Sequence, residues 1–288
     1  MSLSGKTKPF AVIGHPIGHS LSPVMHNASM TSIGYDGIYL ALDVHPDRLM
    51  STLPVMQDMG FGGVNLTVPH KEIAFQGLSQ LDETARLYGA VNTVSFNNNE
   101  MIGYNTDGYG FLKALEESFG KCVENDRVFI LGCGGAGRAI ALLAAKEGAS
   151  SIILSDINQS RIEQLINDVS SQFPSAKIDY AIDKESQINQ CKSADLVIQA
   201  SPIGMNLDDE VLLPNEAFHS NQRVFDLIYM YPETGILSVA KKEGAEISNG
   251  LGMLLHQGAK SFHIWTGKDP DINIMRSSLE KEVYSSVK

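Results

Sequence analysis

Val128-Phe-Ile-Leu131 is followed at once by Gly132-Cys-Gly-Gly-Ala-Gly137 and then by a run rich in Ala and Leu. A buried strand, a glycine loop and a helix in this order are typical of a doubly wound α/β domain. The spacing permits a tight turn at Gly132, close approach of backbone to a phosphate at Gly134 and close helix packing at Gly137. We therefore predict a dinucleotide pyrophosphate at the start of the following helix, against the loop residues Gly132, Gly134, Gly135, Ala136 and Gly137. The alternative is a glycine-rich turn without a ligand.

An acidic residue follows the next predicted strand. Ser151–Leu154 is that strand, and Asp156 comes shortly after it. A carboxylate in this place accepts hydrogen bonds from the adenosine ribose hydroxyls and repels a 2′-phosphate, so we expect NAD in preference to NADP. Two alternatives remain: Asp156 as the N-cap of the following helix, and Arg161 as a group that binds the 2′-phosphate of NADP.

Apolar runs of strand length alternate with segments of helical period along most of the chain. This alternation predicts α/β architecture with mainly parallel sheets. The expected strands are 10–13, 39–42, 63–68, 90–96, 101–104, 127–131, 151–154, 196–199 and 224–226. The expected helices are 24–33 (with Ser22 as N-cap), 46–59, 106–119, 138–147, 159–169, 252–266 and 274–285. A turn is expected at 97–99, between the two strands of a hairpin.

The charge balance excludes several classes of partner. Because 22 Lys and Arg face 33 Asp and Glu, the formal charge is −11. Such a protein repels phosphate backbones and anionic membranes, so we expect neither nucleic acid nor a membrane as partner. No apolar run approaches the roughly 18 residues that span a bilayer. The three cysteines lie far apart, so we expect no disulfide, no metal site and a reducing cytoplasm. A homodimer is left open.

Four short polar clusters precede the predicted dinucleotide domain. Gly18-His-Ser20-Leu-Ser22 places two hydroxyls beside a helix start, which suits a carboxylate. Asn65-Leu-Thr67-Val-Pro-His-Lys71 follows a predicted strand end, and Gly89-Ala-Val-Asn92 and Asn105-Thr-Asp107 lie at other element ends. Each cluster alone is more often a turn, a cap or a surface patch. Together they predict a site for a polyhydroxylated molecule, with His70 interpreted as a packing residue rather than a proton relay.

In combination these motifs resemble the shikimate dehydrogenase family, including its quinate/shikimate members, over nearly the whole chain from Phe10 onward. The resemblance is carried by Ser20-x-Ser22-Pro23, Asn65-x-Thr67-Val-Pro-x-Lys71, Gly89-Ala-Val-Asn92, Asn105-Thr-Asp107-Gly-x-Gly110, the glycine loop, Ala200-Ser-Pro-Ile-Gly-Met205, Asp226-Leu-Ile-Tyr229 and Gly250-Leu-Gly-Met-Leu-Leu-His-Gln257. It implies two α/β domains: a discontinuous substrate domain, 9–106 with 249–288, and a Rossmann domain for NAD or NADP, 107–248. The last helices are then expected to return to the first domain.

The resemblance also implies roles for individual residues. Lys71 and Asp107 would be the catalytic pair, with Lys71 transferring the proton and Asp107 orienting it and the reacting hydroxyl. The substrate carboxylate would be bound by Ser20, Ser22 and Tyr229, and the ring hydroxyls by Thr67, Asn92 and Gln257. The residues near the nicotinamide would be Met205, Leu227 and Gly250.

Two departures from the family pattern indicate a subtype. Tyr104 stands where many biosynthetic members carry an acidic residue, and Asp156 stands where NADP-dependent members carry an Asn-Arg-Thr motif. We therefore expect reversible NAD-linked oxidation of shikimate to 3-dehydroshikimate and of quinate to 3-dehydroquinate. The rivals are an NADP-dependent biosynthetic reductase and a non-catalytic relative that senses the ligand.

Overall fold

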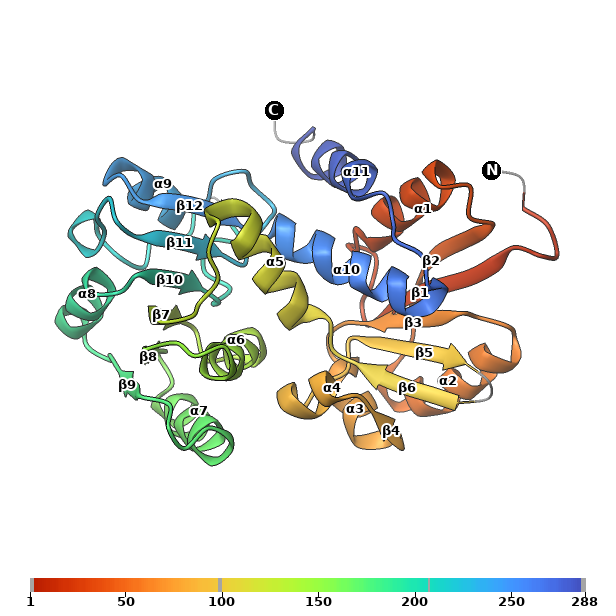
Figure 1. Ribbon diagram of the computed structural model, residues 1–288, viewed down its shortest axis with the longest axis horizontal. Coiled ribbons are helices and arrows are strands. Elements are labelled where there is room, and N and C mark those ends of the chain that lie inside the picture. Colours follow the sequence, from red (N-terminus) through yellow and green to blue (C-terminus); the bar gives the residue numbers. More distant parts are fainter. Residues whose placement is uncertain (1–2, 98–99, 207, 286–288) are drawn as a thin grey trace. The chain divides into compact units, whose positions relative to one another are not determined.

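The computed structural model describes residues 3–97, 100–206 and 208–285. The chain divides into two compact units: unit 1 combines Met1–Phe111 with Leu254–Lys288, and unit 2 is Leu112–Met253. Figure 1 shows unit 1 in red to yellow together with the darker blue residues from Leu254 onward, and unit 2 in green to lighter blue. The division falls within helices α5 (Asp107–Phe119) and α10 (Leu251–Thr266). The boundaries expected from the sequence, 106/107 and 248/249, lie a few residues before these points.

Unit 2 is an α/β domain. Its described residues form a fully parallel, six-stranded sheet in the order β12-β11-β10-β7-β8-β9. The central strands β7 (Arg127–Leu131) and β10 (Leu196–Gln199) are almost wholly buried, as expected for a sheet covered on both faces. The other elements are α6 (Gly135–Lys146), β8 (Ser151–Ser155), α7 (Gln159–Gln172), β9 (Ile178–Tyr180), α8 (Lys184–Lys192), the 3-10 turn η2 (Asn215–Ala217), β11 (Arg223–Asp226), α9 (Gly235–Lys242) and β12 (Glu246–Asn249).

The strand order of unit 2 reverses between β7 and β10, which is where ligands bind in open α/β sheets. Gly132 follows β7 with a φ of +96°, a conformation that favours glycine. A Cβ added there would lie 2.7 Å from the backbone nitrogen of Ser201, in the loop after β10. A Cβ added to Gly137 would lie 1.8 Å from the carbonyl oxygen of Gly132. The loop after β7, the loop after β10 and helix α6 therefore pack so closely that these two positions require glycine.

Unit 1 has a mixed sheet, six-stranded within the described residues, in the order β2-β1-β3-β5-β6-β4. Strand β1 (Lys8–Gly14) pairs in parallel with β2 (Gly37–Asp43) and β3 (Gly63–Leu66). Strands β5 (Thr93–Asn97) and β6 (Glu100–Tyr104) form an antiparallel hairpin beside β3, and β4 pairs in parallel with β6. The other elements are α1 (Ser22–Ser32), the 3-10 turn η1 (Pro46–Arg48), α2 (Leu49–Asp58), α3 (His70–Gly77), β4 (Gln80–Leu81), α4 (Glu83–Tyr88) and α11 (Ile272–Tyr284).

Several short elements differ from the sequence-based prediction, which lacks β4, α3, α4, β9, α8, α9 and β12. Short helices owe their stability to packing more than to their own sequence, so a brief apolar pattern does not indicate them. Ser22 lies inside α1, and the cap position is Leu21, without a side-chain hydrogen bond, so the prediction of Ser22 as N-cap is wrong. The helix predicted at 46–59 is η1 followed by α2. The turn predicted at 97–99 falls partly on residues 98–99, outside the described residues.

Strand β1 is buried on both faces of the unit 1 sheet. Ala11 and Ile13 belong to one apolar cluster, with residues of α2, β3 and β5. Phe10 and Val12, which point to the opposite face, belong to a second cluster with residues of α1, β2 and α10. In unit 2, the apolar core includes side chains of β7, β10, β11 and α9. Each unit therefore has a core of its own.

His26, on α1, is a polar residue buried beside the second cluster of unit 1. Its ring stacks on that of Tyr39, with the centroids 4.2 Å apart. Neither ring nitrogen has a hydrogen-bond partner among the described residues. Because nothing replaces the lost water, burial lowers the pKa of His26 to about 3. His26 is therefore neutral in the folded protein, while the unfolded chain takes up the proton near pH 6.5.

We expect His26→Phe to make the folded state of unit 1 less sensitive to acid. A histidine with a depressed folded-state pKa binds its proton more weakly when folded. The free energy of unfolding therefore falls by about 1.4 kcal/mol per pH unit as the pH drops below 6.5, until about pH 3. Between pH 7.5 and pH 5, the wild type should lose about 2 kcal/mol that the variant retains.

Urea unfolding followed by Trp265 fluorescence measures this difference, because Trp265 is the single tryptophan and a neighbour of His26. His19→Asn, at an exposed position, is the matched control. Equal pH dependence in the wild type and His26→Phe would contradict the prediction.

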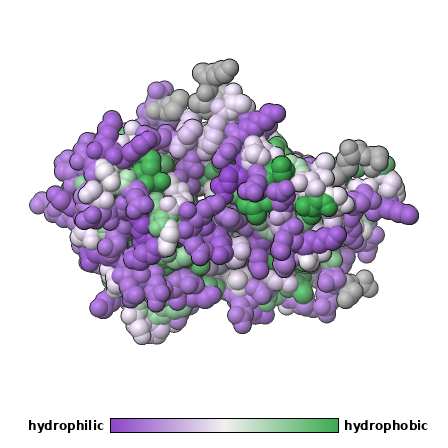
Figure 2. Space-filling model, turned by 45° about the horizontal axis from the view of Figure 1, so that its top comes forward, coloured by the Kyte–Doolittle hydropathy of each residue, from purple (hydrophilic) through white to green (hydrophobic). Residues whose placement is uncertain are grey.

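The face of the molecule drawn in Figure 2 is largely polar. Figure 2 shows polar side chains over most of the visible face and apolar side chains in small separate patches. Scattered apolar residues of this kind are ordinary for a globular protein and indicate no docking surface. Within the part of the chain that the structure describes, each helix is too short or too polar to cross a bilayer.

Candidate active site

The register of the unit 1 sheet brings the four polar clusters to one edge. Strands β1 and β3 run in parallel and end at this edge, where the segments of Ser20 and Lys71 follow. Strand β5 is antiparallel to β3, so its first residue, Thr93, pairs with Asn65 near the end of β3. Strand β6 is antiparallel to β5, so its last residue, Tyr104, pairs with Thr93. The clusters before β5 and after β6 therefore reach the same edge.

Lys71 and Asp107 form an ion pair at this edge. Nζ of Lys71 lies 2.7 Å from Oδ2 of Asp107, and the side chains keep 30% and 19% of their surface exposed, so both are shielded yet accessible. Lys71 lies in the first turn of α3, whereas we expected it at a strand end. The chain leaves the sheet because Pro69 cannot donate to a ladder, and the amide of His70 donates instead to the carbonyl of Thr67.

The amide of Asn92 holds the other oxygen of Asp107. The backbone N–H of Thr106 can only donate, so the Asn92 atom that lies 2.8 Å from it is Oδ1. Nδ2 of Asn92 then donates to Oδ1 of Asp107 at 2.8 Å and to Oε1 of Gln257 at 3.3 Å. Asp107 thus accepts a lysine on one oxygen and an amide on the other, which suits an ionised carboxylate in one orientation.

A buried hydroxyl network supports Asn92, and the sequence analysis missed its role. Oγ of Ser261, on α10, lies 2.8 Å from Oγ1 of Thr93, 3.2 Å from Oγ1 of Thr106 and 3.0 Å from Nδ2 of Asn65. Thr93 and Thr106 also hydrogen-bond Oδ1 of Asn92. One signal could have found Ser261: it follows Gln257 by one helical turn, so both residues lie on the same face of the helix.

The other substrate residues predicted in unit 1 are Ser20, Ser22 and Thr67. Within the described residues, they do not belong to this hydrogen-bond network. Oγ of Ser20 accepts a long bond, 3.4 Å, from the backbone N–H of Ser22. Ser22 is buried. Thr67 is half-buried, and its amide donates to the carbonyl of Ile13. In the described residues, the structure joins Gln257 to the Lys71–Asp107 pair through Asn92, but it forms no such link for Ser20, Ser22 or Thr67.

His70 faces the interior of unit 1, although it precedes Lys71. Its Nε2 lies 2.8 Å from the carbonyl oxygen of Val44, so Nε2 carries the proton. Its Nδ1 is buried and has no hydrogen-bond partner in the part of the chain that the structure describes. Burial lowers the pKa of His70, which keeps the ring neutral. This position agrees with its interpretation as a packing residue.

The glycine loop of unit 2 has the form of a phosphate site. Helix α6 begins at Gly135, earlier than the expected residue 138, because the glycines themselves form its first turn with Ala136. The N-cap, Gly134, has no side chain to occupy the first amide groups. A Cβ added to Gly134 or Gly135 would meet none of the described atoms within 4 Å. The first turn of α6 therefore has free space beside Gly134 and Gly135, and a pyrophosphate there would meet the positive end of the helix dipole.

Asp156 supports this loop from the end of β8. Its Oδ2 accepts the backbone N–H of Cys133 at 2.7 Å, and its Oδ1 accepts that of Asn158 at 2.8 Å. The N-cap of α7 is Asn158, so the alternative reading of Asp156 as this cap is wrong. Ile157 is fully exposed, and Arg161 is exposed on α7. Asp156 is thus an acid joined directly to the glycine loop.

The residues predicted near the nicotinamide follow β10 (Met205), β11 (Leu227) and β12 (Gly250), which are neighbouring strands of unit 2. Leu227 and Gly250 touch: a Cβ added to Gly250 would lie 2.1 Å from the carbonyl oxygen of Leu227. Tyr229 is half-buried, and this burial raises its pKa. Met205 is exposed, and its carbonyl accepts the hydroxyl of Tyr231 at 3.2 Å.

Known proteins are similar to this chain over nearly its whole length. The model of the shikimate dehydrogenase substrate binding domain matches residues 12–94, and that of the shikimate 5'-dehydrogenase C-terminal domain matches residues 250–280. The shikimate dehydrogenase (NADP(+)) of Methanopyrus kandleri is 38% identical over 97% of each chain. A crystal structure of a shikimate dehydrogenase in complex with NADP+ superposes with a TM-score of 0.90, at 36% identity over 98% of each chain. The shikimate 5-dehydrogenase of Listeria monocytogenes, in complex with shikimate and NAD, gives a TM-score of 0.91 at 31% identity, over 97% of this chain and 98% of that one.

Proposed function

Because the chain belongs to the shikimate dehydrogenase family, we propose that it catalyses the reversible oxidation of shikimate to 3-dehydroshikimate with a nicotinamide dinucleotide. The observation that carries the proposal is the ion pair of Lys71 and Asp107, 2.7 Å long, with Asn92 on the second carboxylate oxygen. Oxidation of an alcohol needs a group that takes the hydroxyl proton as hydride leaves the same carbon. The accessible amine of Lys71 is such a group in its uncharged form, and Asp107 holds it in place.

The other predicted residues supply binding. The hydroxyls of Ser20 and Ser22 and the phenol of Tyr229 are proposed to bind the substrate carboxylate. Thr67, Asn92 and Gln257 are proposed to bind the ring hydroxyls. Asn92 is the best supported of these, because its amide already contacts both Asp107 and Gln257. In the reverse direction, the protonated Lys71 returns its proton to the carbonyl oxygen.

The residues of unit 2 fit a dinucleotide. A bound nicotinamide supplies the acceptor for the hydride. Gly134, Gly135 and Ala136 offer backbone amides to its pyrophosphate, and Gly137 permits the close packing of α6 that aims them. Leu227, Gly250 and Met205 are proposed to line the nicotinamide end, because they lie on loops at the carboxyl edge of the same sheet.

We further propose NAD as the preferred cofactor. Asp156 presents a carboxylate beside the glycine loop, where it accepts ribose hydroxyls and repels a 2′-phosphate. Its neighbour Ile157 is apolar and exposed, and so offers no cation to a phosphate. NADP is the second candidate. The name of the M. kandleri relative favours it, and the exposed Arg161 offers a positive charge.

Quinate is proposed as a second substrate, oxidised to 3-dehydroquinate. It carries the same carboxylate and an equivalent reacting hydroxyl, so it meets the same groups of unit 1. It also carries a further hydroxyl on the carbon that bears the carboxylate, close to where Ser20 and Ser22 are proposed to bind. We therefore expect turnover of both acids, with the difference between them in KM.

Steady-state kinetics with shikimate and quinate against NAD and NADP test these proposals together. We expect kcat/KM for NAD to exceed that for NADP by about tenfold or more, because a charged hydrogen-bond partner is exchanged for a repelled phosphate. A preference for NADP would overturn the cofactor proposal and leave the reaction intact. Binding of shikimate without turnover under any pairing would overturn the reaction in favour of a ligand sensor.

A further inference from the structure

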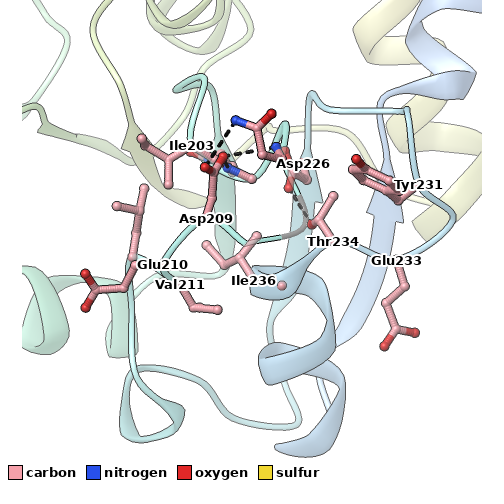
Figure 3. A pocket seen from close by; sticks show the side chains of 14 residues that line it. Ile203, Asp209, Glu210, Val211, Asp226, Tyr231, Glu233, Thr234 and Ile236 are labelled. Atoms are coloured by element: carbon pink, nitrogen blue, oxygen red, sulfur yellow. Dashed lines mark hydrogen bonds between the residues drawn. The ribbon is translucent and has the colours of Figure 1, made fainter.

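Two loops of unit 2 enclose a small pocket at the carboxyl ends of β10 and β11. One loop follows β10 and includes Ile203 and Asp209, and the other follows β11 and includes Tyr231 and Thr234. Asp226, the last residue of β11, lines this pocket, and Figure 3 shows it beside Thr234. The two loops are those that carry Met205, Leu227 and Tyr229.

Asp226 is wholly buried and accepts two hydrogen bonds. Its Oδ1 accepts the backbone N–H of Ile228 at 3.0 Å, and its Oδ2 accepts the hydroxyl of Thr234 at 2.6 Å. The peptide of Ile228 is held on its other side as well, because its carbonyl accepts the amide of Gly250 at 3.2 Å. The amide of Leu227 donates to the carbonyl of Gln199 at 2.9 Å. The backbone between Leu227 and Tyr229 is therefore held by hydrogen bonds on both sides, and Asp226 accepts one of these bonds.

The hydroxyl of Thr234 hydrogen-bonds Asp226 and not the helix that Thr234 begins. Thr234 is the N-cap of α9, where a threonine hydroxyl ordinarily accepts an amide of its own helix. Here no such capping bond forms, and the hydroxyl is directed at Asp226 instead. Figure 3 shows this bond along the pocket wall. The helix therefore forgoes a stabilising cap, and the carboxylate of Asp226 gains a donor.

We infer that Asp226, which accepts the hydroxyl of Thr234, is a positioning residue that orders the Leu227–Tyr229 segment for dinucleotide binding. The inference rests on the proposed function, which places that segment at the nicotinamide end. Asp226 is not proposed to contact the dinucleotide. Asp226 acts through the amide of Ile228, and Thr234 acts through Asp226.

A pH dependence follows from the same geometry. Burial raises the pKa of Asp226 to about 6, and the hydrogen bonds from Thr234 and Ile228 oppose this rise. The other ionisable groups that line the pocket are Asp209, Glu210, Glu233 and Tyr231, and none of the described lining residues is a cation. In Figure 3 the side chains of Glu210 and Glu233 point away from Asp226. Protonation of Asp226 adds an O–H that needs an acceptor and weakens the hydrogen bonds that Asp226 accepts, so dinucleotide affinity should fall as the pH drops through about 6.

The test is direct binding of the reduced dinucleotide that the wild type prefers, measured by its fluorescence between pH 5 and 8.5. Thr234→Val keeps the shape of the side chain and loses no cap, because none exists. We expect its Kd to rise about tenfold at pH 8, the effect of one hydrogen bond to a charged group. We also expect the pH below which its affinity falls to be about one unit higher than in the wild type, since the same hydrogen bond opposes protonation of Asp226.

Two further variants separate positioning from general damage. Thr234→Ser retains the hydroxyl and should restore the wild-type Kd and the wild-type pH dependence. Asp226→Asn cannot titrate, so it should bind weakly with no fall in affinity near pH 6. Wild-type binding by Thr234→Val at every pH, or equal loss in Thr234→Ser, would overturn the inference. Because binding is measured without turnover, failure of the proposed reaction leaves this result distinguishable.

Discussion

Lys71→Met is expected to lower kcat for shikimate oxidation by about a thousandfold, while KM for shikimate and the Kd of the dinucleotide change far less. The substitution keeps an unbranched side chain in the first turn of α3 and removes only the amine that takes the hydroxyl proton. Asp107 retains the Asn92 amide on Oδ1, so its orientation should survive. Single-turnover rates at saturating shikimate, beside steady-state kinetics, measure the loss in the chemical step.

Lys113→Met is the matched control. Lys113 pairs with Glu116 at 2.6 Å on the exposed surface of α5, so this variant also breaks a lysine–carboxylate pair. Its kcat should equal that of the wild type, because exposed pairs contribute little. If Lys71→Met kept a near-normal kcat and merely bound the dinucleotide more weakly, Lys71 would not be the proton-transfer group.

The double substitution Asp156→Asn with Ile157→Arg is expected to change the ratio of kcat/KM for NAD over NADP by about a thousandfold, in favour of NADP. The first change removes the repulsion of a 2′-phosphate and one ribose acceptor. The second places a guanidinium beside the phosphate, at a position that is fully exposed and so has room for it. Each effect is about 1.5–3 kcal/mol, and the two multiply in the ratio.

The two single variants separate the contributions of Asp156 and Ile157 to the change in cofactor preference. Ile157→Arg alone leaves the carboxylate in place and should gain NADP activity by about tenfold. Asp156→Asn alone should lose NAD activity, because an amide keeps only one of the two bonds to the amides of Cys133 and Asn158. A wild type that already prefers NADP, with no further gain in the double variant, would show that Asp156 does not select the cofactor.

Local sequence determined the parts of this protein whose structure depends on short-range contacts. Strand β7, the glycine loop and the start of the next helix follow one another in the chain, so their composition and spacing indicated them. The positive φ of Gly132 and the close approach of Gly137 confirm why glycine stands at both positions. The strand at 196–199 was predicted with the bounds that β10 has. The family was also indicated by the sequence, because its motifs occur in combination, and the comparisons confirm it.

Only the tertiary structure decided which polar groups meet. Lys71 pairs with Asp107 because the antiparallel pairing of β5 and β6 returns the chain to the edge where β3 ends. Helix α3, which orients Lys71, is too short to be indicated by its own sequence. Ser261 reaches Asn65 from the far end of the chain, and Thr234 gives its hydroxyl to Asp226 instead of its own helix. Spacing along a sequence carries the periods of helices and strands, but partners this distant depend on sheet order and packing, which no local pattern encodes.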